Sequence, residues 1–331
     1  MVEAVRRQFG SGLIAALLAA AAFGTSGPFA KSLIEAGWTP TLVVFIRMVG
    51  ASVALLPFAI GPLVRQWQSV RRNVPLVIAY GLLAVGLAQL GYFQAVERLP
   101  VGVALLLEFL GVVIVVLVVW FLTRVRPHRL TFLGMALAIG GLVFVLDITG
   151  AVRPDLVGVA WGLVAAFGLA GHFILAGRPN PIPSIAFACL GLGTGAVALG
   201  VLGLVQVLPM SAGSGTVTLL GAQTPAWVAF GELILIAAAL AYVLAIMGAR
   251  RLGSTLASFI GLTEVLFAIG FAWLLLGELP RPIQLLGGAF ILAGVVAVRL
   301  GERAAFLASE GEPNVEPNAE ELIERHPTPA H

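Results

Sequence analysis

The chain contains a long apolar segment with one acidic residue near its middle, and it contains this segment twice. In the second copy, residues 251–278, Arg251 begins the segment, Glu264 lies near its centre and Glu278 ends it. A run of this length and composition is typical of a membrane-spanning helix. A carboxylate at the centre of a span costs about 2.5–3.5 kcal/mol on insertion scales, so it usually faces the protein interior or a water-filled path.

The duplication extends well beyond this segment. Shifting the sequence on itself by 153 positions aligns residues 98–143 with residues 251–296 without a gap. A second match, at an offset of 144, joins residues 21–29 to residues 165–173, and the polar stretch 210–224 can absorb the difference between the two offsets. The sequence therefore predicts two structural repeats.

The composition places both repeats in a membrane. Hydrophobic residues make up 60% of the 331 residues and charged residues only 11%, whereas soluble domains are about a quarter charged. The net charge of +3 comes from basic residues scattered over short loops, which does not indicate a nucleic-acid partner. Cys189 is the single cysteine, so an intrachain disulfide is excluded.

Hydropathy predicts an all-α integral membrane protein with about ten transmembrane helices, five in each repeat. The first repeat occupies residues 12–149 and the second residues 157–301. Residues 1–11 form a short N-terminus, and the acidic, proline-containing segment 302–331 is expected to be a disordered tail. The first span imitates a secretory signal peptide, but its recurrence at 165–173 argues for a retained helix. The expected spans are 12–33, 41–61, 74–95, 101–122, 131–149, 157–177, 183–208, 226–248, 254–276 and 284–301.

Loop charges predict the orientation of the helices. If the loops alternate between two sides, one side receives most of the arginines and the other receives only Lys31, Arg98, Arg153 and Arg281. By the positive-inside rule the first side, which holds both termini, is cytoplasmic, in a multi-pass protein of the cell (plasma) membrane. Because each repeat has an odd number of spans, the two copies are expected to enter the membrane in opposite directions. This inverted-repeat plan is typical of secondary transporters, whose site lies near the midplane between the repeats.

Two acids inside the spans are the first candidates for a substrate path. Glu108 and Glu264 lie in corresponding helices of the two repeats, although Glu264 aligns with Gly111 and Glu108 lies one turn earlier. The two acids could face one cavity from opposite sides and there carry protons or bind a cationic group. The alternative is a protonated carboxyl that is hydrogen-bonded between helices for structural reasons.

His172 and Arg47 are the other ionisable candidates. His172 could exchange a proton near neutral pH, or it could be a buried neutral histidine bonded to a neighbour. Arg47 could bind a substrate carboxylate with its guanidinium, or it could pair with Glu108 or with helix-end carbonyls. By contrast, Lys31 and Glu232 lie nearer helix ends and are expected to be interfacial.

The interruption of the first span supplies further path residues. Ser26, Gly27 and Pro28, with Gly171 at the equivalent place in the second repeat, form the kind of broken helix that lines transporter sites; a tolerated kink is the alternative. Two tyrosines, Tyr92 and Tyr242, complete the predicted path, although packing is the commoner role of such residues.

The halves resemble the paired repeats of the drug/metabolite transporter superfamily, specifically its EamA-type members with ten helices. The motifs that carry the resemblance are GLTEVLFA at 261–268, WLLLGE at 273–278 and QLLGGAFILAG at 284–294. Residues 24–33 (GTSGPFAKSL), Arg47 and Leu107-Glu108-Phe109 are also similar to the threonine/homoserine exporter branch.

From the residues and this resemblance we expect a secondary transporter that exports small polar metabolites such as amino acids by alternating access, with protons as the candidate coupling ion. No nucleophile–base pair and no metal-ligand spacing is evident, so the sequence predicts no enzyme activity, no metal and no cofactor. The expected partners are a small-molecule substrate and the lipid bilayer. A lipid-handling protein or a membrane-embedded enzyme that uses the same central cavity remains the alternative.

Overall fold

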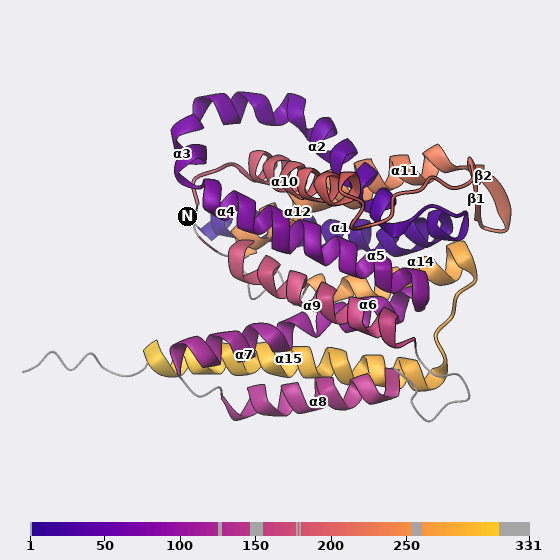
Figure 1. Ribbon diagram of the computed structural model, residues 1–331. Helices are drawn as coiled ribbons and strands as arrows, with labels where there is room; N and C mark the ends of the chain where they lie inside the picture. Colours follow the sequence, from indigo (N-terminus) through magenta and orange to yellow (C-terminus); the bar gives the residue numbers. More distant parts are fainter. Residues whose placement is uncertain are drawn as a thin grey trace, which may run out of the picture.

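Apolar helices build almost the whole of the computed structural model, which describes residues 2–124, 128–145, 155–176, 178, 180–252 and 260–310 (Figure 1). The helices of the first half are α1 (Val2–Glu35), α2 (Pro40–Arg65), α3 (Trp67–Arg72), α4 (Val74–Ala79), the π-helix η1 (Tyr80–Leu87), α5 (Ala88–Arg98), α6 (Val101–Phe109), α7 (Gly111–Thr123) and α8 (Arg129–Val145). The second half contains α9 (Leu156–Ala176), α10 (Ser184–Leu204), β1 (Thr216–Leu219), β2 (Ala222–Pro225), α11 (Ala226–Ile234), the π-helix η2 (Leu235–Leu240), α12 (Ala241–Leu252), α14 (Thr263–Leu276) and α15 (Pro282–Glu310).

Seven of the described helical segments are long and apolar enough to cross a membrane. Three shorter apolar helices, at Arg129–Val145, Thr263–Leu276 and Pro282–Val298, occupy the places of the other expected spans. The residues beside two of them, 146–154 and 253–259, lie outside the described chain.

Prolines mark where several of these helices begin. Pro40 and Pro282 occupy the first turn of α2 and α15, and Pro100, Pro183 and Pro225 directly precede α6, α10 and α11. The first turn of a helix tolerates proline because its N–H groups have no intrahelical partner, and the fixed φ of proline suits a helix start. The sequence therefore defines these boundaries locally.

The helix pairings remain the same when the two halves are exchanged. Helix α1 packs against α12 and α14, and its counterpart α9 packs against α5 and α6. Helix α2 packs against α10, and α8 packs against α15. This correspondence agrees with the duplication in the sequence.

Glycines make the α8–α15 pairing close and reciprocal. A Cβ on Gly141 would lie 2.6 Å from the Gly287 carbonyl oxygen, and a Cβ on Gly287 would lie 2.6 Å from that of Gly141. Gly134 and Gly294 oppose each other in the same way. In a membrane, helices associate mainly through van der Waals packing, so small residues that allow backbone contact favour such a pair.

Unusual helical geometry also recurs in both halves. The π-helices η1 and η2 lie in corresponding spans, Val74–Arg98 and Ala226–Leu252, and in similar register under the 153-residue offset. Short π segments inside α-helices are frequent at functional sites, because they widen the backbone and release carbonyl groups.

The structure adds one detail to the expected fold and corrects another. In and directly after the polar stretch 210–224, Thr216–Leu219 and Ala222–Pro225 pair as an antiparallel hairpin. Leu220 and Gly221 form its two-residue turn, with φ of 53° and 73°, the positive values that such tight hairpins require. In addition, α15 continues to Glu310, so residues 302–310 of the segment expected to be a disordered tail are helical, while 311–331 lie outside the described residues.

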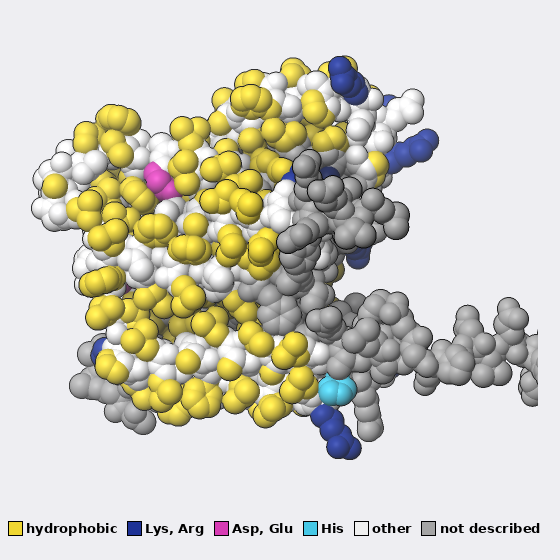
Figure 2. Space-filling view, turned by 180° about the vertical axis from the view of Figure 1, so that it is seen from behind, with side chains coloured by type: hydrophobic (Ala, Val, Ile, Leu, Met, Phe, Trp, Pro, Cys, Tyr) yellow, Lys and Arg dark blue, Asp and Glu magenta, His cyan; other side chains and the backbone are white. Residues whose placement is uncertain are grey.

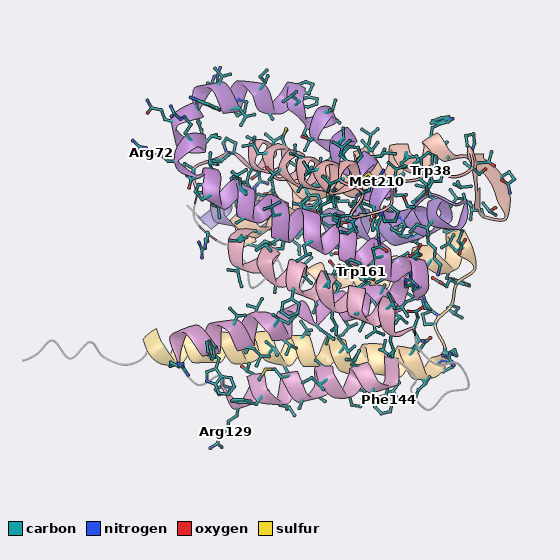
Figure 3. All side chains as sticks on the ribbon, in the orientation of Figure 1. Trp38, Arg72, Arg129, Phe144, Trp161 and Met210 are labelled. Atoms are coloured by element: carbon teal, nitrogen blue, oxygen red, sulfur yellow. The ribbon has the colours of Figure 1, made fainter. Side chains whose placement is uncertain are left out.

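The surface is apolar along the helices and basic at one end. Figure 2 shows hydrophobic side chains over the flank, with lysine and arginine side chains gathered toward one side of the view. Figure 3 places Arg72 and Arg129 at one end of the molecule and Trp38 and Phe144 at the other. We name the first the arginine end and the second, which carries β1 and β2, the hairpin end (Figure 1).

Candidate functional site

A cavity of about 130 Å³ lies between the two halves of the molecule. Its polar lining comes from Gln89, Glu108, His172, Tyr242 and Glu264. Most of the remaining wall is apolar and small, with alanines at positions 16, 19, 20, 84, 88, 176, 245 and 249. Because α9 and α12 end at the arginine end (Figure 1), the lining residues Ala176 and Ala249 show that the cavity extends toward that end.

The structure brings the two predicted acids to this cavity. Glu108 belongs to α6 and Glu264 to α14, and the two carboxyls are near enough to interact electrostatically. Each acid lies two residues from a helix break, at Leu110 after Glu108 and at Leu262 before Glu264. Both breaks occur without a proline in the helix, and both give a tight i→i+3 hydrogen bond, from Val113 N–H to the Leu110 carbonyl and from Val265 N–H to the Leu262 carbonyl.

His172 lies in the same cavity and contacts a tyrosine of the other half. Its Nδ1 is 3.3 Å from the hydroxyl oxygen of Tyr80, the first residue of η1. The two rings are tilted, with centroids 5.7 Å apart. The histidine therefore joins α9 to η1 at the arginine end of the cavity, as the alternative of a histidine bonded to a neighbour anticipates.

Arg47 lies behind the cavity wall and is almost completely buried, with 1% of its surface exposed. Its guanidinium donates hydrogen bonds to Gln89 Oε1 and to the Ala237 carbonyl oxygen in η2, and it lies over the Phe93 ring at 5.4 Å. It therefore bonds a carbonyl within a span, rather than the helix-end carbonyls or the Glu108 carboxyl of the alternatives. Since it also interacts electrostatically with Glu264, it places a positive charge beside the acids.

The predicted residues of the broken helix pack next to the cavity, outside its lining. Ser26 and Gly27 lie in α1, and Pro28 follows them within the same helix. A Cβ on Gly27 would collide with the Tyr92 hydroxyl, so Tyr92 packs directly against this glycine. Gly171 approaches Leu83, where a Cβ would lie 3.1 Å from the leucine Cβ. These contacts fit a packing role, and a role in transport remains a prediction for each.

Ion pairs join the loops at the hairpin end. Lys31 Nζ lies 2.6 Å from Glu278 Oε1, and the Val101 N–H donates to Glu278 Oε2 at 2.9 Å. Arg98 Nη1 lies 3.6 Å from Asp155 Oδ2. The Gly158 N–H donates to Asp155 Oδ1 at 2.9 Å and thereby lowers the pKa of that exposed carboxyl. Lys31 thus lies near a helix end, as predicted, and its ion pair connects α1 to the segment after α14.

A second, apolar crevice of about 160 Å³ lies between α6, α14 and α15. Val103, Leu106, Ile269 and Leu285 are among its lining residues, and it shares none with the cavity that holds the acids. A lipid in this crevice would therefore lie apart from Glu108 and Glu264. Within the described residues, no group of three or more His, Cys, Asp and Glu side chains is placed to hold a metal ion.

Comparison with known families matches both halves of the chain to the same family. Residues 10–147 and residues 156–300 each match the EamA-like transporter family. The chain belongs to the EamA-like transporter family. The protein is therefore a membrane transporter rather than an enzyme, as the sequence predicts, and its two matched segments agree with the predicted duplication.

Individual relatives of this EamA-like transporter agree with the family. The chain is 29% identical over 265 residues to the probable terminal-alkyne amino-acid exporter of Streptantibioticus cattleyicolor, a match that covers 78% of this chain and 84% of that protein. A solved crystal structure that is 18% identical superposes with a TM-score of 0.58, over 88% of this chain and 98% of its own. The latter shows a shared fold only.

The structure of this EamA-like transporter also reveals polar residues at the site that were not predicted from the sequence. Gln89 lines the cavity and accepts from Arg47, and Tyr80 meets His172. Glu232, which was expected to be interfacial, instead points into the bundle, where the Thr25 hydroxyl is bonded to its Oε1. A signal was present for Gln89 and Tyr80, since both interrupt the apolar span 74–95 with polar groups away from its ends. For Glu232, six residues after Ala226, the helix position alone was ambiguous.

Proposed function

We propose that this EamA-like transporter exports amino acids, or closely related small polar metabolites, across the plasma membrane by alternating access. The observation that carries the proposal is the cavity between the two halves, in which Glu108 and Glu264 lie in a wall made largely of alanines. Acidic groups suit the ammonium of an amino acid, and the alanine wall leaves apolar space for a slender side chain. The printed name of the Streptantibioticus relative supports the same substrate class.

In this proposal the ten apolar helices form two inverted five-helix repeats, and both termini lie on the cytoplasmic side. The positive-inside rule then turns the arginine end toward the cytoplasm. The exchange-symmetric helix pairings and the reciprocal glycine contacts of α8 and α15 support this arrangement. In this arrangement the cavity would be open to the cytoplasm, as an exporter requires when it binds its substrate. The Lys31–Glu278 ion pair would hold the other end closed.

Purified protein in liposomes tests the proposal with a panel of amino acids that includes terminal-alkyne analogues. We expect saturable transport of at least one amino acid. Glu108→Gln should raise the apparent KM about tenfold or more, because a hydrogen bond to a charged group contributes about 1.5–3 kcal/mol. Glu97→Gln, at the partly exposed end of α5, is the matched control.

The same assay assigns the acids. Glu264→Gln keeps the size of the side chain, and we expect it to transport substrate but respond less to an imposed pH difference than wild type does. If the two phenotypes are exchanged, Glu264 binds the substrate and Glu108 the proton. If both variants transport like the Glu97→Gln control, the acids do not take part in transport and the proposed path is wrong.

A further inference from the structure

A second polar cluster lies between the cavity and the hairpin end, where α1 crosses α11. Thr25 of α1 lies within hydrogen-bond distance of Glu232 Oε1, and Arg47 of α2 interacts electrostatically with the same carboxyl. Glu232 Oε2 is buried and has no hydrogen-bond partner among the residues that the structure describes. A buried carboxyl with one oxygen unsatisfied needs an explanation beyond packing.

The geometry around Thr25 indicates where a proton resides. Thr25 Oγ1 lies 2.6 Å from the Ala22 carbonyl oxygen as well as next to Glu232 Oε1. A carbonyl oxygen can only accept, and the hydroxyl has a single proton to donate. When Thr25 donates to Ala22, a protonated Glu232 can supply the hydrogen between the two side chains. Both contacts of Thr25 are then satisfied without a buried negative charge.

Few positive charges near Glu232 favour loss of its proton. The elements packed against α11 are α1, α2, η2, β1 and β2. On them, Glu3, Arg6 and Arg7 lie in the first two turns of α1, far along the helix from Thr25. Lys31 is paired with Glu278, and Glu35 and Arg65 lie at helix ends. Neither η2 nor the hairpin carries a charged residue. Arg47 is the charge that faces Glu232, and its Nη1 and Nη2 groups donate to Gln89 and Ala237 instead.

The duplication relates this cluster to a second polar contact, beside the cavity. Under the two sequence offsets Thr25 corresponds to Leu169, one turn before His172, and Glu232 corresponds to Ala79, beside Tyr80. The His172–Tyr80 contact, whose histidine lines the cavity, thus lies within one turn of the positions equivalent to the Glu232–Thr25 contact. In inverted-repeat transporters access switches sides largely through rocking or gating of one repeat against the other around the site.

We propose that Glu232 is a proton-binding site of the transport cycle, sealed and protonated in this conformation and exposed to the hairpin side when the protein opens there. This inference rests on the proposed export function and adds to it a second group, besides Glu264, that gains and loses a proton. Thr25 positions the carboxyl, and the proton moves between Glu232 and the aqueous phase on the hairpin side. Glu108 then binds the substrate, and Glu264 exchanges its proton on the cavity side.

The transport test separates charge from packing. In liposomes, Glu232→Gln retains the hydrogen bond to Thr25 but cannot release a proton. We expect it to keep substrate counterflow within about twofold of wild type while losing most of the acceleration by a pH difference. Thr25→Val, which keeps the acid, should retain that acceleration with an altered dependence on the pH of the hairpin side. Loss of counterflow in Glu232→Gln, or an unchanged pH response, would overturn the proposal.

A second measurement needs no transported substrate. Dicyclohexylcarbodiimide reacts with protonated carboxyls in apolar surroundings, and mass spectrometry of the treated membrane protein identifies the modified residue. We expect an adduct on Glu232 whose yield falls as the pH is raised, with no adduct at this position in Glu232→Gln. An unmodified Glu232 at every pH would refute the inference even if export is confirmed. If no amino acid is transported but Glu232 titrates in this way, the export proposal fails and the proton site stands.

Discussion

At the residue scale, the site combines two acids that line a cavity with an arginine that is enclosed by protein. Glu108 and Glu264 border open space beside helix breaks, whereas Arg47 is enclosed and bonded through Nη1 and Nη2. A buried guanidinium is costly unless its hydrogen bonds are made, so Arg47 stabilises this conformation only while Gln89 and the Ala237 carbonyl remain in place. Ala237 lies in a π-helix, whose altered hydrogen bonding leaves carbonyls accessible to such a donor.

Replacing Arg47 with lysine should therefore destabilise the protein although the charge is kept. A lysine cannot donate to two separated acceptors in the guanidinium geometry, so one acceptor is left unsatisfied at a cost of about 1–3 kcal/mol. The measurement is thermal unfolding of detergent-purified Arg47→Lys against Arg65→Lys, which changes an exposed arginine at the end of the same helix. Equal melting temperatures for the two variants would contradict the bonded role of Arg47.

At the scale of elements, the backbones of α8 and α15 approach each other closely. Gly134, Gly141, Gly287 and Gly294 each meet the backbone of the opposite helix, which cannot move aside as a side chain can. Gly140, next to Gly141, faces open space instead, with no atom within 4 Å of a Cβ placed there. The chain thus provides two neighbouring glycines, one at the helix contact and one outside it.

Gly141→Leu should separate α8 from α15 and reduce stability, while Gly140→Leu should be tolerated. Overpacking a close contact typically costs about 1–3 kcal/mol, and a backbone contact gives little scope for relief. The comparison requires the yield of folded protein in membranes and the melting temperature of each variant. Similar losses in both variants would mean that the helix itself, rather than the contact, rejects a larger residue.

At the scale of the whole molecule, the cavity extends toward the arginine end and ion pairs join the loops at the hairpin end. The Lys31–Glu278 pair joins the first half to the second, and Glu278 also accepts a hydrogen bond from the Val101 N–H at the start of α6. In the proposed mechanism, opening at the hairpin end would separate at least one of these contacts. The Lys31–Glu278 pair is therefore the place to test that opening.

Cross-linking this pair should stop transport in the proposed mechanism. Lys31→Cys and Glu278→Cys, combined with Cys189→Ser to remove the single native thiol, should be joined by a bifunctional methanethiosulfonate reagent that spans the length of the former ion pair, which blocks transport until reduction releases it. Each single-cysteine variant is the control. Transport that continues in fully cross-linked protein would contradict opening at this end.

The orientation of the whole chain gives a separate prediction. A reporter placed after residue 303 and another inserted in the loop 210–215 should lie on opposite sides of the membrane, with the first in the cytoplasm. Fused alkaline phosphatase is active only outside the cytoplasm, and a fused fluorescent protein of the cytoplasmic type is fluorescent only inside it. The two reporters together assign each position to one side. Both reporters on one side would be incompatible with the proposed inverted repeats.

The sequence by itself determined the membrane class, the duplication and the candidate acids, because hydropathy, repeat offsets and buried charges are local and costly features that a single chain displays directly. It also defined helix starts through prolines such as Pro40 and Pro225. Only the tertiary structure decided which polar groups meet. Glu232 and Gln89 acquire their places from helices distant in sequence, and the Thr216–Pro225 hairpin from the pairing of two short strands. Helical periodicity states which face a residue occupies but not which neighbour that face meets, so these contacts follow from packing alone.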